Sequence, residues 1–332
     1  LALALAACVG LAHGNPSRQL LEDALPYLLF ALGLAAGRGG HRPRALLLAA
    51  LLVCLADSAI SLYRMPSYDL SRVRSTYFYF RIIGGTPLVG LYIVSALPRL
   101  DRERARVRGR PPPQSKRARR LWSLLALLLV LAVVATVSRG MLLALALGVG
   151  TAVYLRRPSR GLSLAALAGL GLLLFTPALS QFGEHYLRLG SLSTVGGRMR
   201  EIIHCLYVFS TRPALGLGLG AEFVVDSHVI SYVHNMIAYH LWKFGLLGSA
   251  LLSAPLWAMA QQAARAPHDA RAAILGGAVS VLAYLVTCAS YKSYTLVPLL
   301  GVVVGATLAL LAELRLDARR ARLHAPAGAS AP

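Results

Sequence analysis

The stretch LWSLLALLLVLAVVATV at residues 121–137 continues through SRG at 138–140 into MLLALALGVGTAVYL at 141–155. Two long apolar runs therefore flank a short polar break that contains Arg139. Because the hydrocarbon core of a bilayer offers backbone amides no partner, apolar runs of this kind are typical of membrane-spanning helices. The short break predicts a tight helical hairpin with Arg139 at its tip.

Further apolar runs on both sides of this hairpin bring the candidate spans to ten. They occupy residues 1–13, 21–37, 45–63, 82–98, 162–182, 235–260, 272–290 and 296–312. Several are shorter than the ~20 residues that cross ~30 Å of hydrocarbon. We expect an all-α fold, a polytopic transmembrane helix bundle of about ten spans. The first run is short and has neither a Met nor a basic lead-in, so we expect a truncated N-terminus.

The composition excludes an ordinary cytosolic enzyme. Of 332 residues, 57% are hydrophobic and 14% are charged, whereas about 25% of a typical soluble domain is charged. The mean hydropathy is +0.61. Four cysteines, three of them in apolar runs, provide no disulfide framework.

The basic residues predict how the bundle is oriented. Lys and Arg total 34 against 13 acidic residues, which gives a formal charge of +21. Of the 34, 22 lie in segments 38–44, 99–120, 156–160, 265–271 and the tail after residue 312. These segments alternate with the other connections, so the positive-inside rule places them in the cytoplasm. Segment 64–81, with four arginines, is the exception.

Segment 99–120 is the most basic of these connections, with ten Lys or Arg residues. A nucleic-acid-binding arm and a topology anchor at anionic lipid headgroups are the two interpretations. No aromatic residues interleave with its charges, as base stacking would need. We therefore favour the membrane lipid as its partner and expect no nucleic acid.

The spans and charges divide the chain into four parts. Residues 1–180 are expected to form transmembrane helices 1–7, residues 181–234 a periplasmic loop, residues 235–312 helices 8–10, and residues 313–332 a cytoplasmic tail. The stretch 181–233 is the one long outer connection, at 53 residues. It carries acidic residues, histidines and arginines, so we expect any chemistry at this outer membrane–water boundary.

Three features of the long loop can be interpreted from their residues. Residues 198–210 have helical spacing, with Arg198 and Arg200 in the first turn, and Pro213 ends the helix. The glycines of GLGLG at 216–220 resemble a dinucleotide fingerprint, but without a strand–turn–helix context they indicate a permissive turn. The histidines lack zinc-site spacing, so we expect no metal.

At the exit of this loop, His234-Asn235 is followed after nine residues by Gly245-Leu-Leu-Gly248. This pattern, H-[N/S/Q]-x9-G-x-x-[G/T/Y], resembles the signature of bacterial O-antigen ligases, within the O-antigen ligase and polymerase superfamily of membrane glycosyltransferases. By chance it would occur in only a few per cent of chains of this composition.

Two upstream stretches add to the resemblance. Arg139 with Leu143 is similar to the family's R-x3-L motif, which has little specificity in a leucine-rich chain. The stretch from Arg198 to Arg212-Pro213 and the glycine turn resembles the family's arginine-bearing helix and turn. The resemblance covers residues 138–248, about a third of the chain. Family members have about twelve spans with the long loop before the tenth, which agrees with two missing N-terminal helices.

The resemblance implies a site facing the periplasm in a multi-pass protein of the bacterial inner membrane. The donor would be a glycan on undecaprenyl diphosphate and the acceptor a hydroxyl of the lipid A core or another glycan, with no cofactor or metal. Arginine binds phosphate bidentately, and histidine can take the acceptor's proton. The resemblance assigns catalytic roles to His234, Arg198 and Arg139, and substrate binding to Arg200, Asn235, Gly245, Gly248 and Arg212.

Other functions and roles stay open. An O-antigen or exopolysaccharide polymerase and a protein O-oligosaccharyltransferase would use the same donor. A lipid-linked sugar flippase or transporter belongs to a different class, although no internal repeat supports it. Arg139 as a helix cap and His234 as an ordinary helix-terminal residue are the simpler readings. Lys243 lies inside a span and would snorkel, pair or line the lipid-carrier cavity.

Overall fold

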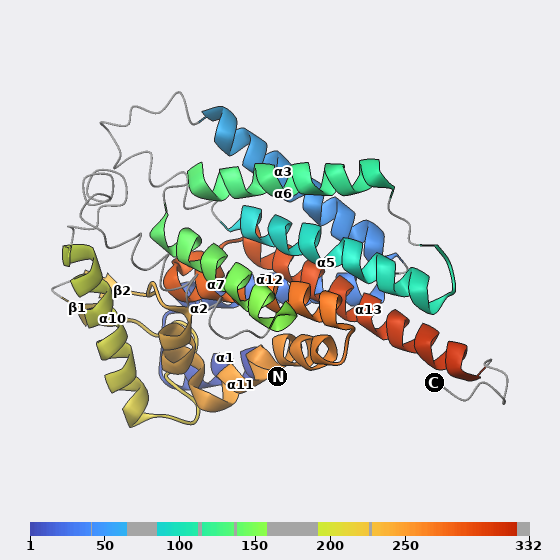
Figure 1. The fold of residues 1–332 in the computed structure, drawn as a ribbon. Helices are drawn as coiled ribbons and strands as arrows, with labels where there is room; N and C mark the ends of the chain where they lie inside the picture. The colour runs from blue at the N-terminus through green and yellow to red at the C-terminus, as the bar shows by residue number, and fades with distance from the viewer. Residues whose placement is uncertain are drawn as a thin grey trace.

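The structure, a computed structural model, describes residues 1–40, 42–64, 85–111, 115–135, 138–157, 192–225 and 228–323. Over these residues the fold is a bundle of α-helices with one short antiparallel β-hairpin, β1 (Phe223–Val225) and β2 (His228–Ile230), in which Val224 pairs with Val229 (Figure 1). The expectation of a helical bundle is confirmed.

Among the described residues, six helices are long and apolar enough to cross a membrane, so the chain is a multi-pass membrane protein. They are α2 (Ser17–Gly39), α3 (Pro43–Arg64), α6 (Lys116–Ala135), α11 (Met236–Ala264), α12 (His268–Thr287) and α13 (Leu296–Leu323). Helices α1 (Ala2–Ala12) and α7 (Arg139–Arg156) are apolar but shorter, and α5 (Thr86–Val107) carries arginines along its second half. The run at 162–182 lies outside the described residues, so about ten spans stays a prediction.

Helices α2 and α13 approach each other closely through small residues. Gly33 and Gly37 of α2 lie against Gly301 and Gly305 of α13. A Cβ atom at Gly33 would lie 2.3 Å from a backbone oxygen of α13, and one at Gly305 would lie 2.4 Å from the Leu34 oxygen of α2. In both helices the glycines are four residues apart, the spacing that lets membrane helices pack backbone to backbone. This contact places the second half of α2 beside the first half of α13.

Helix α7 packs along α12 rather than along α6. Gly148 of α7 and Gly276 of α12 face each other, and a Cβ at Gly276 would lie 2.7 Å from the Gly148 oxygen. Helix α6 instead covers α5, where Leu129 lies against Gly90. The connection between α6 and α7 is short, as expected, but the two helices diverge (Figure 1). Arg139 is the first residue of α7, as the predicted hairpin requires, but facing glycines pack α7 along α12 and not along α6.

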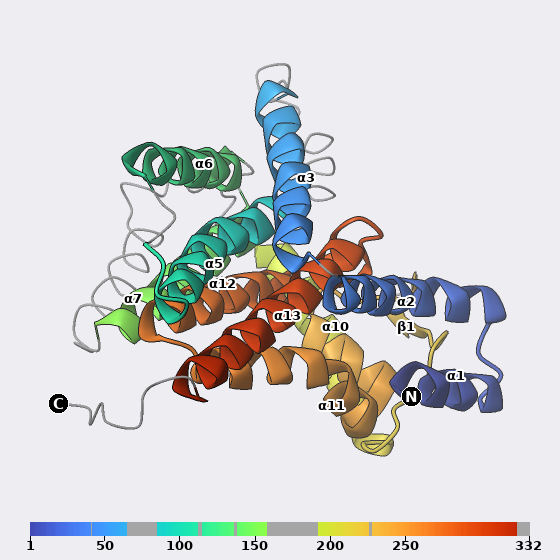
Figure 2. The ribbon, with the colours of Figure 1, turned by 90° about the vertical axis from the view of Figure 1, so that its right-hand side faces the viewer.

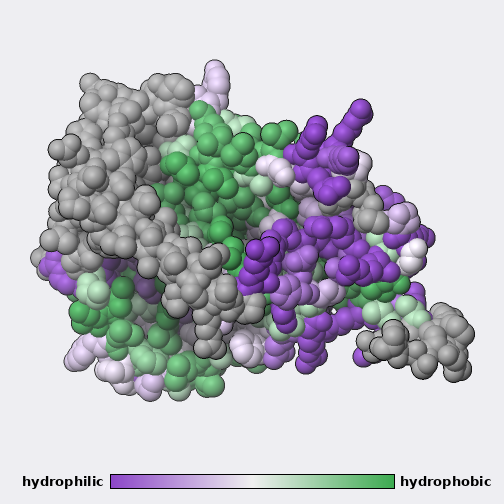
Figure 3. Space-filling model, in the orientation of Figure 1, coloured by the Kyte–Doolittle hydropathy of each residue, from purple (hydrophilic) through white to green (hydrophobic). Residues whose placement is uncertain are grey.

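The basic segments gather at one end of the bundle, which we call the basic end. Ion pairs join neighbouring elements there: Arg44–Asp101, Arg104–Glu313, Arg108–Asp317 and Arg156–Asp269. On the surface, hydrophilic residues are concentrated over the ends of α5 and α13, beside an apolar face (Figure 3). The charge pattern therefore separates the two ends of the bundle; which side of the membrane each end faces stays a prediction.

The opposite end, called the site end below, is where α2, α11 and α13 begin and α12 ends. A short 3₁₀-helix (Ala289–Lys292) connects α12 to α13 here. Helix α1 lies beside α2 and the start of α11 (Figure 2). Helix α10 (Leu192–Thr211) packs against α11 and leads into the β-hairpin. Part of the stretch expected to be a loop, residues 181–234, is therefore helical, as the spacing of residues 198–210 predicts.

Candidate functional site

His234 at the mouth of α11 is held by a carboxylate from α10. Its ring Nδ1 lies 3.1 Å from Oε2 of Glu201, and its backbone N–H donates to the same oxygen at 3.1 Å. The side chains remain partly accessible, at 28% for His234 and 18% for Glu201. A carboxylate at Nδ1 fixes the orientation of an imidazole ring, so the ring's Nε2 is the nitrogen left to contact a substrate.

Arg198 lies one helical turn before Glu201 on α10. Its Nη1 donates to the backbone oxygen of Thr287 at the end of α12, at 3.4 Å. Its buried Nε has no hydrogen-bond partner among the described residues. Partial burial opposes ionisation of Glu201, but hydrogen bonds from His234 and the charge of Arg198 hold the pKa of Glu201 below its ordinary value. The pair therefore includes a charged carboxylate at neutral pH.

The two faces of α10 differ in what they contact. Glu201 and the fully buried Cys205 face the bundle, and burial raises the pKa of the Cys205 thiol to about 12. The outer face is apolar, with exposed side chains at Met199, Ile203, Leu206 and Tyr207. Such a stripe is typical of a helix that lies in the membrane interface. Arg200 and Arg212 are exposed, and neither forms part of the Glu201–His234 pair.

Arg139, the first residue of α7, is the third arginine of the predicted site. The structure describes its backbone position but not its side chain. The next residue, Gly140, lies against α12, where a Cβ would be 2.8 Å from Oγ1 of Thr287. Because Thr287 also accepts the hydrogen bond from Arg198, the start of α7 is at the site end. The structure thus brings the elements that carry Arg139, Arg198 and His234 together.

The glycine turn after Pro213 completes a break in α11. Gly245 has φ +61° and ψ −168° inside the helix, a conformation that is essentially restricted to glycine. The carbonyls of Trp242 and Lys243, which this break would leave unpaired, accept from the N–H groups of Leu217 and Gly218. The three turn glycines all have positive φ. The interpretation of GLGLG as a permissive turn is confirmed.

Three residues assigned to substrate binding have structural roles. Asn235 is the N-cap of α11, with its side-chain oxygen accepting from the Ala238 N–H at 2.9 Å. Gly245 forms the break. Gly248 lies against Phe244 of the preceding turn, and a Cβ atom at Gly248 would be 2.8 Å from the Cβ of that phenylalanine. Helix geometry accounts for these three residues, and their contact with substrate stays a prediction.

A second cluster of charges lies beneath the break. Lys243 is fully buried and forms an ion pair with Asp23 of α2, which is also fully buried. Lys292 approaches the other oxygen of Asp23 at 2.6 Å, and the Tyr239 hydroxyl donates to that oxygen at 2.8 Å. The N–H of Gly220 donates to Asp23 at 2.9 Å. One carboxylate thus faces two ammonium groups, which leaves this cluster with an excess positive charge.

The two clusters are connected by aromatic residues. The Tyr291 hydroxyl donates to the backbone oxygen of Val233, the residue before His234. The Tyr232 ring lies 5.9 Å from the His234 ring, and Nζ of Lys292 lies 5.9 Å from the Tyr232 ring. The Lys292 side chain is 19% exposed, so it is not sealed in the interior as Lys243 is. Together the two clusters form a site with a histidine, two carboxylates and several cations.

Sequence reasoning missed Glu201, Asp23 and Lys292, although it named Lys243 and left open whether it pairs. A signal for Asp23 was present, because an ionisable residue within an apolar span marks a functional or paired position. Glu201 was recognised only as one of the acidic residues of the long loop. His204, which stacks on Phe223 at 4.4 Å, lies outside both clusters.

Within the described ranges, no three histidine, cysteine, aspartate or glutamate side chains are grouped as a metal site requires. Independence of metal stays a prediction. None of the protein-family models, curated proteins or solved structures compared with the chain matches it. The likeness to O-antigen ligases therefore rests on the motifs, and the function has to be argued from the geometry of the site end.

Proposed function

We propose that this protein is an O-antigen ligase-like membrane glycosyltransferase that transfers a glycan from undecaprenyl diphosphate to a sugar hydroxyl of the lipid A core. The observation that carries the proposal is the Glu201–His234 pair, with Nδ1 and Oε2 3.1 Å apart, next to Arg198. An oriented imidazole and a phosphate-binding cation are the two groups that this reaction needs.

His234 acts as the general base. Glu201 accepts a hydrogen bond from Nδ1–H, so Nε2 is the basic nitrogen and takes the proton of the acceptor hydroxyl as the oxygen attacks. The imidazolium that forms is stabilised by the Glu201 carboxylate, whose pKa is held low. Partial exposure of both side chains allows a sugar hydroxyl to reach the ring.

The cations bind the leaving diphosphate. Arg198 presents a planar guanidinium that forms two parallel hydrogen bonds to a phosphate, and its Nε has no partner among the described residues. Lys292, whose side chain is partly exposed and lies near the Tyr232 ring, adds an ammonium group. The attacking oxygen forms the new bond to the anomeric carbon, the bond from that carbon to the phosphate oxygen breaks, and the electron pair leaves with the lipid diphosphate.

The donor-sharing alternatives differ in the acceptor. An O-antigen or exopolysaccharide polymerase takes a second lipid-linked glycan, and a protein O-oligosaccharyltransferase takes a protein hydroxyl. A specific observation favours the different class, a lipid-linked sugar transporter: α11 is broken at Gly245 beside the buried Asp23–Lys243 pair. Broken helices beside charged residues are typical of transporter substrate sites.

The test is an assay of the purified full-length protein in detergent with an undecaprenyl-diphosphate-linked glycan and a lipid A core acceptor. We expect glycosylated acceptor and free undecaprenyl diphosphate in equal amounts. His234→Ala should lower the rate by ~10²–10⁴-fold, as loss of a general base does. Arg198→Lys should restore little of the activity lost in Arg198→Ala, because an ammonium group lacks the guanidinium geometry.

His268→Ala serves as the matched control, since His268 is a partly exposed histidine at the basic end. It should leave the rate unchanged. An active His234→Ala protein would contradict the role of His234. A folded wild-type protein could instead transfer no glycan but move the lipid-linked glycan across vesicle membranes. This result would overturn the glycosyltransferase proposal in favour of the transporter.

A further inference from the structure

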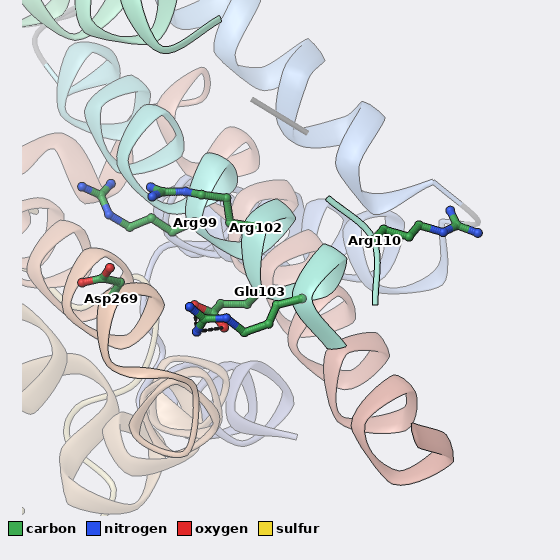
Figure 4. Close-up of a pocket in the computed structure, with 6 residues that line it drawn as sticks. Arg99, Arg102, Glu103, Arg110 and Asp269 are labelled. Atoms are coloured by element: carbon green, nitrogen blue, oxygen red, sulfur yellow. Dashed lines mark hydrogen bonds and ion pairs between the residues drawn. The ribbon is translucent and has the colours of Figure 1, made fainter. Parts of the chain in front are cut away.

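The basic end of the bundle contains a cavity that the proposed function does not use. It has a volume of about 450 Å³ (Figure 4). Its charged walls are Arg99, Arg102, Glu103, Arg106 and Arg110 of α5 and the loop after it, and Asp269 of α12. Four arginines therefore line this cavity with only two carboxylates.

Three of these arginines, Arg99, Arg102 and Arg110, lack a carboxylate partner among the described residues. Arg106 pairs with Glu103 at 3.4 Å. Arg99 and Arg102 donate instead to backbone oxygens of the preceding turn of α5, and no described carboxylate lies within ion-pair distance of either. Their guanidinium groups point to the same side of α5, above Asp269, whereas Arg110 points away from them (Figure 4).

The environment of Arg99 is unfavourable for its charge. Burial, together with the neighbouring charges of Arg156 and Arg102, lowers the pKa of Arg99 to about 10. The nearby carboxylate, Asp269, pairs with Arg156 at 3.9 Å and not with Arg99. Positive charges held this close together are stabilised by a bound anion, and guanidinium groups bind phosphate bidentately.

An apolar groove continues from this cavity along the bundle. It has a volume of about 270 Å³ and lies between α5, α7 and α12. Most of its lining is aliphatic, with Leu91, Val149 and Val153 among the walls, while Arg99 and Arg156 line its polar end. Because Arg99 lines both spaces, the groove and the basic cavity meet at this residue.

We propose that the two spaces form one binding site for an anionic phospholipid, with the phosphate between Arg99 and Arg102 and an acyl chain in the groove. The apolar groove distinguishes a lipid from a free phosphate ion, which would use only the basic cavity. A zwitterionic lipid is a poorer ligand because its ammonium group meets the same arginines. The site lies at the end of the bundle opposite His234 and is independent of the proposed transfer reaction.

Native mass spectrometry of the full-length protein in detergent tests this site. The probes are dioleoyl phosphatidylglycerol, dioleoyl phosphatidylethanolamine, dihexanoyl phosphatidylglycerol and inorganic phosphate. Dioleoyl phosphatidylglycerol should bind at least about tenfold more tightly than each of the others, since charged hydrogen bonds and a buried chain both contribute. Equal competition by inorganic phosphate or by the short-chain lipid would overturn the proposal of a lipid.

In the double variant Arg99→Gln/Arg102→Gln, the affinity for dioleoyl phosphatidylglycerol should fall by about tenfold or more, so that the preference for this lipid is lost. The matched control, Arg319→Gln/Arg320→Gln, removes the same charge from exposed positions of α13 and should retain it. An equal loss of lipid affinity in both double variants would show general attraction to the charged surface and would overturn the proposed site. Val149→Trp, at an exposed position in the groove, should weaken the binding of the long-chain lipid while leaving the arginines intact. If the double variant does not fold, this variant still tests the proposal.

Discussion

Glu201 connects two functions within one side chain. The same oxygen accepts hydrogen bonds from the backbone and from the ring of His234, so it fixes both the start of α11 and the direction of the imidazole. A neutral amide oxygen at this position could still accept both bonds, but without a charge it would not stabilise an imidazolium as a carboxylate does. Activity and local stability are therefore expected to respond together when Glu201 is changed.

The stability of this pair should depend on pH in a defined direction. The folded-state pKa of Glu201 lies below its ordinary value, so its contribution is fully present above the unfolded pKa of about 4.3 and is lost as the pH falls through the lowered value. Glu201→Gln should cost about 1 kcal/mol at pH 7 and progressively less below pH ~4. Thermal unfolding of the detergent-purified proteins between pH 3 and 7 measures the difference. A difference that stays constant to pH 3 would contradict this prediction.

The buried carboxylate of Asp23 should matter more to folding than any exposed acidic residue of the same helix. Asp23→Asn leaves Lys243 buried without a countercharge, and the expected cost is about 3–5 kcal/mol of unfolding free energy. Asp23→Leu combined with Lys243→Met removes both charges and should cost less than the single change. Glu22→Gln is the control, because its pair with Arg18 is exposed and should contribute less than about 1 kcal/mol. An equal effect of Glu22→Gln and Asp23→Asn on thermal unfolding would argue against the buried pair.

At the scale of elements, α11 brings the two charge clusters of the site together. His234 lies just before its first turn, and Lys243 lies two turns into the helix. The break at Gly245 leaves two carbonyl groups without helical partners, and these accept hydrogen bonds from the glycine turn. The same glycine turn also positions the Gly220 N–H, which donates a hydrogen bond to Asp23.

Gly245→Ala should disrupt this arrangement. A Cβ at this position would lie 2.5 Å from the Ala214 oxygen, and φ is +61°. Backbone strain alone is expected to cost about 1–3 kcal/mol, and transfer should fall because α11 would straighten. Gly39→Ala, at the end of α2 with nothing within 4 Å of the added atom, should leave thermal unfolding and transfer unchanged. Wild-type stability in Gly245→Ala would mean that the break tolerates a side chain.

The helices could be predicted from apolar run length because lipid leaves the backbone few other structures. The helix expected from residue 21 begins earlier, at Ser17. The last helix continues beyond the apolar run 296–312 to Leu323, although six of these added residues are charged. Pairing between distant residues could not be predicted: Glu201 and His234 are 33 positions apart, and their contact depends on how α10 packs. The divergence of α6 and α7 likewise depends on glycine contacts with α12 that no local pattern specifies.

At the scale of the whole molecule, the two ends of the bundle have different chemistry. The basic end carries exposed arginines and their ion pairs, which suit anionic headgroups. The site end carries a histidine, two lysines and an arginine around two carboxylates. The proposed reaction requires that the site end face the compartment where the lipid-linked glycan and its acceptor meet. Orientation is therefore the property on which the function depends.

Helix α11 allows orientation to be measured with two substitutions. Its part after the break, Leu246–Ala264, has 19 residues, which at ~1.5 Å per residue give about 28 Å, close to the ~30 Å of a hydrocarbon core. We therefore expect residues before and after α11 to lie on opposite sides of the membrane. In a Cys8→Ala background, Tyr232→Cys should react with a membrane-impermeant maleimide in intact cells. Arg265→Cys, directly after the helix, should react only once the inner membrane is opened, as the positive-inside rule requires. Labelling of both from outside would mean that α11 does not cross the membrane, and the reverse pattern would place His234 in the cytoplasm, away from a lipid A core acceptor.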